Sequence, residues 1–207
     1  MKKLLALIVY VMAFCTQATE ERNLVLVTVD GLRWQEVFQG KQQTLIENEK
    51  LTQHKNELID TLALLPAEQA KSSLMPFMWG MVARKGTIIG DRTILSNMSV
   101  ANQWYFSYPG YSEIFTGVIN AKLNSNAKVD NPEISFLEWL SHERGYRDIA
   151  AFGSWDVFPY ILNTKRSKLY VNAGFTPATL SKHSEQVKLL NDLQQEIPSP
   201  WHNVRLD

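Results

Sequence analysis

Residues 102–117 read Asn-Gln-Trp-Tyr-Phe-Ser-Tyr-Pro-Gly-Tyr-Ser-Glu-Ile-Phe-Thr-Gly, and the organisation expected of the whole chain follows from this segment. Pro109 and Gly110 form a rigid turn after Ser107, and the apolar spacing that follows predicts a helix ending near Gly117. The Ser107 hydroxyl is therefore expected at a helix entrance, where unpaired backbone N–H groups and the helix dipole favour an anion such as phosphate. The alternative is that Ser107 is only the N-cap of a buried helix.

The second informative segment is residues 23–34, which read Asn-Leu-Val-Leu-Val-Thr-Val-Asp-Gly-Leu-Arg-Trp. A short run rich in Val and Leu that stops at Asp30 and Gly31 is typical of a buried parallel strand. The Asp30 carboxylate would then emerge at the carboxyl end of that strand. Open α/β sheets bind their ligands at this edge, so the segment predicts a carboxylate in a ligand-binding position.

Taken together, the two segments resemble the alkaline phosphatase superfamily, particularly its type I phosphodiesterase and nucleotide pyrophosphatase branch. In that branch a strand ending in Asp-Gly-hydrophobic-Arg supplies a metal-binding Asp, and residues 30–33 match it as Asp-Gly-Leu-Arg. A later Thr/Ser-x-Pro-Asn-His segment supplies the nucleophile, and residues 107–111, Ser-Tyr-Pro-Gly-Tyr, match it in the hydroxyl and the proline. Residues 75–77, Met-Pro-Phe, resemble the Met-Pro-Asn-Leu helix between the two motifs, so the order of three segments agrees.

Two positions depart from the pyrophosphatase pattern. Gly110 replaces the Asn and Tyr111 replaces the His, so a side-chain amide that would hold a phosphoryl oxygen is absent. The nucleotide pyrophosphatase substrate range is therefore not implied. The sulfatase pattern, Cys/Ser-x-Pro-x-Arg, fits Ser107 and Pro109 but fails at Tyr111, so formylglycine conversion is not expected.

The resemblance implies a metal-dependent hydrolase of phosphate esters, either phosphomonoesters or phosphodiesters, with Ser107 as the catalytic nucleophile. Asp30 and Ser107 would bind one divalent ion, expected to be Zn²⁺, which lowers the pKa of the serine hydroxyl and neutralises the transferring group. Ser107 would become a phosphoserine, and a second divalent ion would activate the water that hydrolyses it. A sulfatase-like hydrolase of sulfate esters is an alternative of the same chemical type.

Downstream of the serine the sequence predicts one βα repeat of a doubly wound sheet. Residues 132–144 have the apolar spacing of a helix that Gly145 ends, and residues 147–153 read as the next strand. The predicted fold class is therefore α/β, a three-layer αβα domain with a mostly parallel sheet, as in the alkaline phosphatases. Further helical segments are expected at residues 44–65, 76–86 and 176–197.

The predicted substrate-binding residues are Gly110, Trp155 and Asp156. Trp155 and Asp156 follow the strand expected at residues 147–153, at the edge of the sheet where ligands bind. The alternative is that the aromatic side chains around Trp155 form only a packed rim.

Residues 1–18 have the features of a secretory signal peptide. A positively charged start precedes an apolar stretch from residue 4 to residue 14, which is too short to span a bilayer comfortably. The mature protein is thus expected in the periplasm or outside the cell, with no stable membrane span. The only cysteine, Cys15, lies in this segment, so no disulfide or thiolate ligand is expected in the mature chain.

Balanced charge excludes a strongly basic surface. The chain has 21 Lys and Arg residues and 21 Asp and Glu residues, so it has no overall basic field for nucleic acid. The expected partner is instead a small-molecule phosphate or sulfate ester.

Members of the superfamily carry further metal ligands after the nucleophile, in Asp-x-x-x-His and Asp-His pairs, and the chain contains neither kind of pair. Residues 19–207 are therefore expected to be the N-terminal portion of a metallohydrolase domain whose C-terminal part is missing, with weak metal binding and little turnover. One alternative is a secreted, non-catalytic binding domain derived from this fold. Weaker alternatives are a serine esterase, although residues 110–114 lack the closing glycine of Gly-x-Ser-x-Gly, and a glycosidase using Asp30 and Glu36.

Overall fold

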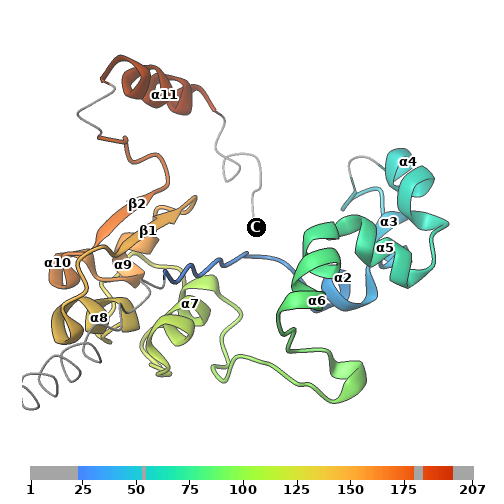
Figure 1. Ribbon diagram of the computed structural model, residues 1–207, viewed down its shortest axis with the longest axis horizontal. Helices are drawn as coiled ribbons and strands as arrows, with labels where there is room; N and C mark the ends of the chain where they lie inside the picture. Colours follow the sequence, from blue (N-terminus) through green and yellow to red (C-terminus); the bar gives the residue numbers. More distant parts are fainter. Residues whose placement is uncertain (1–22, 53–54, 180–183, 198–207) are drawn as a thin grey trace, which may run out of the picture. The chain divides into compact units, whose positions relative to one another are not determined.

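The computed structural model describes residues 23–52, 55–179 and 184–197 of the 207-residue chain. By its internal contacts the chain divides into two units, Met1–Arg33 and Trp34–Asp207. The signal peptide expected at residues 1–18 lies outside the described residues. Figure 1 shows the helices and strands with the labels used below.

In the first unit, residues 23–29 do not form the buried parallel strand that the sequence predicts. Leu24 is 81% exposed and Val27 is 76% exposed, and the segment ends in a turn at Asp30 and Gly31. A strand is held by hydrogen bonds to a neighbouring strand, and none pairs with these residues in the described part of the chain. The prediction was wrong because a Val and Leu pattern forms a buried strand only where a sheet is present to cover it.

The second unit begins with a series of short helices, which include the expected helical segments. Three aromatic rings hold several of them together: Phe38 lies 5.7 Å from Trp34 and 6.1 Å from Trp79, measured between ring centroids. The indole N–H of Trp34 donates to the Gly90 carbonyl, and that of Trp79 donates to the Val37 carbonyl. The elements are α2 (Trp34–Gln39), α3 (Gln43–Ile46), α4 (Lys55–Leu58), η1 (Ile59–Ala63), α5 (Ala67–Leu74), η2 (Met78–Val82), α6 (Ala83–Lys85) and η3 (Arg92–Ile94).

Gly40 allows α2 and α5 to approach closely. Its φ of +82° lies in the left-handed region, and a Cβ at this position would lie 2.4 Å from the backbone nitrogen of Lys71 and 2.7 Å from the Ala67 carbonyl oxygen. A side chain at residue 40 would therefore collide with the backbone of α5.

Helix α7 (Ser107–Thr116) ends where the sequence predicts, but it begins at Ser107, so Pro109 and Gly110 lie inside its first turns and do not form the separate turn that was expected. Gly117 follows it in the left-handed conformation, with φ of 69°, which is the usual way for a glycine to end a helix. The buried side chains recur at helical spacing from Tyr108 through Tyr111 to Phe115.

Helix α8 (Phe136–Arg144) also confirms a sequence prediction. The Ser135 hydroxyl accepts a hydrogen bond from the Glu138 N–H at 3.1 Å, and Gly145 ends the helix with φ of 71°. A serine cap and a C-terminal glycine are local signals, so the sequence specifies this helix without help from the rest of the fold.

A parallel pair of strands follows, joined by two short helices. Strand β1 (Ala150–Gly153) pairs with β2 (Tyr170–Ala173), first residue to first residue and last to last. The connection contains α9 (Phe158–Ile161) and α10 (Thr164–Ser167), which makes a βαβ unit. β1 confirms the strand predicted in this region, whereas β2 was not predicted. The last element is α11 (Ser184–Glu196), within the helical segment expected at residues 176–197.

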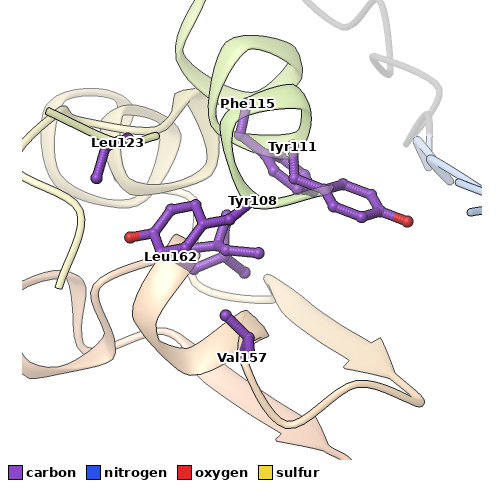
Figure 2. Close-up of a cluster of buried hydrophobic side chains, with 7 residues drawn as sticks. Tyr108, Tyr111, Phe115, Leu123, Val157 and Leu162 are labelled. Atoms are coloured by element: carbon purple, nitrogen blue, oxygen red, sulfur yellow. The ribbon is translucent and has the colours of Figure 1, made fainter. Parts of the chain in front are cut away.

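The hydrophobic core of this part of the chain packs α7 against α9. Figure 2 shows Tyr108 of α7 beside Leu162, with Val157 and, from the loop between α7 and α8, Leu123 on either side of them. The buried members of the cluster are Tyr108, Tyr111, Phe115, Leu123, Val157, Ile161 and Leu162. The start of α7, which carries Ser107, is therefore anchored by packing.

The fold is mixed α/β, and its sheet has two parallel strands within the described residues. The three-layer arrangement that the resemblance implies is not shown, because a larger sheet would be needed to separate two layers of helices. Phe152 of β1 is 77% exposed and Tyr170 of β2 is 51% exposed, so no helix layer covers these two side chains. Within the described residues, no helix is both long and apolar enough to cross a membrane.

Candidate functional site

Ser107 is the first residue of α7, and Phe106 occupies the N-cap position in an extended conformation. The interpretation of Ser107 as the N-cap is therefore wrong. The Ser107 hydroxyl is half-buried and forms no hydrogen bond within the described part of the chain. A hydroxyl at the start of a helix that neither caps the helix nor bonds elsewhere is available to a ligand or a reaction.

The backbone donors at the start of α7 are fewer than the sequence suggests. The Tyr108 N–H donates to the side-chain oxygen of Asn126 at 3.0 Å, and Pro109 has no N–H. The Gly110 N–H points back to the Phe106 carbonyl at 3.5 Å. The sequence led us to expect several unpaired N–H groups at this helix start. Of these, only the Ser107 N–H remains, because the Asn126 side chain already accepts from the N–H of Tyr108.

Asn126 is the site residue that the sequence analysis missed. Its carboxamide lies against the N-terminus of α7, one residue from Ser107, although it is 18 positions away from Tyr108 along the chain. Its Oδ1 accepts from Tyr108, and its Nδ2 amide group makes no hydrogen bond within the described residues. The segment at residues 107–111 has Gly110 where the pyrophosphatase pattern has an Asn side-chain amide. The fold brings the Asn126 amide to the same end of the helix. The only sequence signal was the polar Asn-Ser-Asn tract at residues 124–126.

The chain that leads into Ser107 is held by Glu113, which lies further along α7. The Glu113 carboxylate accepts from the N–H of Ala101 at 2.7 Å and from the N–H and side-chain amide of Asn102 at 3.0 and 2.9 Å. Burial alone would raise the pKa of Glu113, but these hydrogen bonds outweigh it and lower the pKa. Asn102 in turn accepts from the Trp104 N–H, so the approach to the serine has a defined conformation.

Tyr108 fixes the other side of the serine. Its ring is buried, and its hydroxyl donates toward the carbonyl of Val129 at 2.5 Å, with the Tyr160 carbonyl at 3.3 Å. Burial raises the pKa of Tyr108 to about 12, and the charge of Asp130 adds to this effect. The hydroxyl therefore stays protonated and acts as a donor at physiological pH.

Asn131 ties the loop between α7 and α8 into the core. It is fully buried, and its side-chain amide donates to the Ser112 hydroxyl at 3.0 Å and to the Ile161 carbonyl at 3.1 Å. Its backbone N–H donates to the Tyr160 carbonyl, and its own carbonyl accepts from the Asn163 side chain at 2.8 Å. The loop that carries Asn126 is thus bonded to both α7 and α9.

Gly110 and Trp155, two of the predicted substrate-binding residues, lie on different elements. Gly110 is in the first turn of α7, and a Cβ there would meet no atom within 4 Å, so the space beside it is open. Trp155 follows β1 and is half-buried, with its ring edge-on to Phe158 at 6.3 Å between centroids. Trp155 packs on the border of the core, as the alternative interpretation of a packed rim describes.

Asp156, the third predicted substrate-binding residue, pairs with the loop that carries Asn126. Its Oδ2 lies 2.5 Å from the Nζ of Lys128, two residues after Asn126, and this hydrogen bond raises the pKa of Lys128. The carboxyl end of β1 and the α7–α8 loop are therefore in contact. The pair holds one basic and one acidic side chain together at the surface.

The predicted metal ligands lie in separate units. Asp30 belongs to the unit that ends at Arg33, where it occupies an exposed turn, and Ser107 belongs to the unit that begins at Trp34. A carboxylate and a hydroxyl are each oxygen donors of the kind that divalent ions bind. In residues 23–52, 55–179 and 184–197, no group of three or more His, Cys, Asp or Glu side chains could hold a metal ion.

Comparison with known proteins adds no relative. No protein-family model matches the chain, no curated protein matches it, and no solved structure matches it. The functional argument therefore depends on the residues and the geometry described above.

Proposed function

We propose that the chain is part of a hydrolase of phosphate esters, of the alkaline phosphatase type, in which Ser107 is the nucleophile. One observation carries the proposal: an unengaged serine hydroxyl at the start of a well-packed helix, where the Asn126 carboxamide accepts from the N–H of the next residue, Tyr108. The motifs at residues 30–33 and 107–111 support it, because they resemble the metal-binding and nucleophile segments of that superfamily. The proposal includes the fold of that superfamily, a three-layer αβα domain with a mostly parallel sheet, and the parallel pairing of β1 with β2 supports it.

The reaction proposed for Ser107 is a displacement at phosphorus. The serine hydroxyl loses its proton to solvent as its oxygen forms a bond to phosphorus and the bond from phosphorus to the ester oxygen breaks. The ester oxygen takes up a proton from solvent and leaves as an alcohol. Water then cleaves the bond from phosphorus to the serine oxygen and restores the serine hydroxyl. This step releases inorganic phosphate from a monoester substrate or a phosphomonoester from a diester substrate. The Ser107 N–H and the free Nδ2 amide of Asn126 would donate to the non-bridging phosphoryl oxygens, where negative charge is concentrated.

A metal ion has a defined place in this proposal. Divalent ions, expected to be two Zn²⁺ with Asp30 and Ser107 among the ligands, would lower the pKa of the serine hydroxyl and activate the attacking water. The side chains of Ser107 and Asn126 do not depend on a metal for their position, because packing and hydrogen bonds hold α7 and the loop. The signal peptide predicted at residues 1–18 is the reason for proposing a periplasmic or secreted location.

The test compares Ser107→Ala with Ser154→Ala in the full chain. Ser154 is an exposed serine outside the site, so its substitution controls for the loss of any hydroxyl. Each protein is incubated with Zn²⁺ and p-nitrophenyl phosphate, bis-p-nitrophenyl phosphate or p-nitrophenyl sulfate. We expect weak turnover or a single covalent turnover of a phosphate ester, with phosphoserine detected at residue 107 by peptide mass spectrometry.

The variants decide the proposal. Ser107→Ala should reduce phosphoryl transfer by about 100-fold or more, and Ser154→Ala should leave it unchanged. Equal activity in the two variants would overturn the role of Ser107. Cleavage of the sulfate ester alone would replace the phosphatase proposal by the sulfatase-like alternative.

A further inference from the structure

Tyr108, the residue after the proposed nucleophile, holds both ends of a short loop segment. Its backbone N–H donates to the side chain of Asn126, and its side-chain hydroxyl donates to the backbone carbonyl of Val129. Asn126 and Val129 are three residues apart, so one residue of α7 bridges the segment that carries the Asn126 carboxamide. Nothing else in the described residues bonds to the Val129 carbonyl.

We propose that the Tyr108 hydroxyl is a positioning group that keeps the Asn126 carboxamide beside Ser107, ready to donate to a phosphoryl oxygen. This role rests on the proposed function. Tyr108 does not reach the substrate itself, because its ring points into the core and is 1% exposed. It acts through the loop, and its backbone and side chain fix Asn126 from two directions.

The surrounding contacts explain why the hydroxyl, and not the ring alone, has this effect. The ring is held by the core cluster, whose members on α9 are Ile161 and the adjacent Leu162. Asn131 anchors the far end of the loop through Ser112 and Ile161. Asn126 itself is exposed and has no contact of this kind, so the hydrogen bonds from Tyr108 decide where its carboxamide lies.

Removing the hydroxyl while keeping the ring isolates this effect. Tyr108→Phe keeps the packing and deletes the bond to the Val129 carbonyl and the longer contact with the Tyr160 carbonyl. Tyr160→Phe is the matched control, because the Tyr160 ring packs on the same core and its hydroxyl forms no hydrogen bond within the described residues. The backbone carbonyl of Tyr160 is unchanged in either variant.

The experiment uses NMR on the ¹⁵N-labelled full chain, titrated with inorganic phosphate. In the wild type, the Ser107 N–H and the Asn126 side-chain amide signals should shift as phosphate binds. In Tyr108→Phe the backbone N–H of residue 108 should exchange with solvent about tenfold faster than in the wild type. The dissociation constant for phosphate should rise about fivefold. Tyr160→Phe should match the wild type in both measurements.

The outcomes separate the positioning role from the proposed function. Phosphate binding by the wild type with an unchanged dissociation constant in Tyr108→Phe would overturn the positioning role alone, even if the variant melts at a lower temperature. Unchanged exchange of the Tyr108 N–H would overturn it as well. No phosphate-induced shift in the wild type would overturn the proposed function, and the role of Tyr108 with it.

Discussion

The guanidinium group of Arg166 and the carboxylate of Glu138 form a two-point ion pair, with Nε 2.7 Å from Oε1 and Nη2 2.9 Å from Oε2. The same guanidinium donates to the carbonyl groups of Asn131, Pro132 and Glu133. The Glu138 side chain is only 4% exposed, so it has little access to water and depends on Arg166 to balance its charge. This pair joins α10 to α8 and to the loop before it.

Arg166→Met should destabilise the second unit. Methionine keeps an apolar stem but leaves the buried Glu138 carboxylate without its cation. The free energy of unfolding should fall by about 2 kcal/mol, less than the ~3–5 kcal/mol typical of a fully buried pair. The smaller figure follows because the Arg166 side chain is 36% exposed and solvent screens its charge. Urea unfolding followed by circular dichroism measures the change.

Lys165→Met is the control for that variant. Lys165 neighbours Arg166 and pairs with Asp130 at 2.7 Å, but its side chain is 75% exposed. Its substitution should leave the urea midpoint close to that of the wild type. An equal loss of stability in the two variants would contradict the importance of the pair between Arg166 and Glu138.

Glu113 should make the fold less stable in acid. Its pKa in the folded protein is lowered from the ordinary value of 4.5, so the unfolded chain binds the proton more tightly. Its contribution to stability is therefore complete above that ordinary value and is lost as the pH falls through the lowered folded value. Glu113→Gln should flatten this part of the profile of unfolding free energy against pH. Glu143→Gln, on the exposed surface of α8, should keep the wild-type slope, and parallel profiles for both variants would contradict the assignment.

Two glycine substitutions should have different effects on stability. Gly40→Ala places a Cβ 2.4 Å from the Lys71 backbone nitrogen at a positive φ, so the free energy of unfolding should fall by more than ~1 kcal/mol. Gly110→Ala meets open space inside α7 and should raise it by about 0.5–1 kcal/mol, because alanine favours a helix over glycine. Thermal unfolding of both variants checks the contrast. A gain of stability in Gly40→Ala would show that the close contact with α5 is wrong.

Asn126→Asp should increase stability while it weakens phosphate binding. A carboxylate at residue 126 can still accept from the Tyr108 N–H, and negative charge at a helix N-terminus contributes about 0.5 kcal/mol. The same charge repels phosphate and removes the Nδ2 donor, so the dissociation constant should rise about tenfold. Asn124→Asp adds the same charge two residues earlier on the exposed loop and should affect phosphate binding much less. Calorimetric titration with inorganic phosphate separates the two variants.

The sequence predicts those elements of the fold whose signals are local. The ends of α7 and α8 are marked by Gly117 and Gly145, and both glycines have the left-handed conformation that ends a helix. Residues 23–29 carry an equally clear strand pattern, but a strand needs a partner, and the pattern does not say whether one is present. Strand β2, Tyr-Val-Asn-Ala, was missed because Asn172 interrupts the apolar run that marks β1, Ala-Ala-Phe-Gly.

In the candidate site, too, the sequence predicts what local signals specify and misses what depends on the folded chain. The position of Ser107 at a helix start could be predicted, because Pro109 favours the first turn of a helix and Gly117 ends it. The Asn126 carboxamide could not, because only the folded loop brings it to Tyr108. The metal site depends on residues from both units and stays a prediction.

The loop between α7 and α8, residues 118–135, contains no helix or strand, yet Asn131 within it is fully buried and bonded through each of its polar groups. A protease binds its substrate in an extended form, so it cannot cut beside Asn131 until those bonds have opened together. Trypsin should therefore cleave after Lys128 at a rate set by the opening of the whole unit, and urea should accelerate that cleavage as steeply as it unfolds the core.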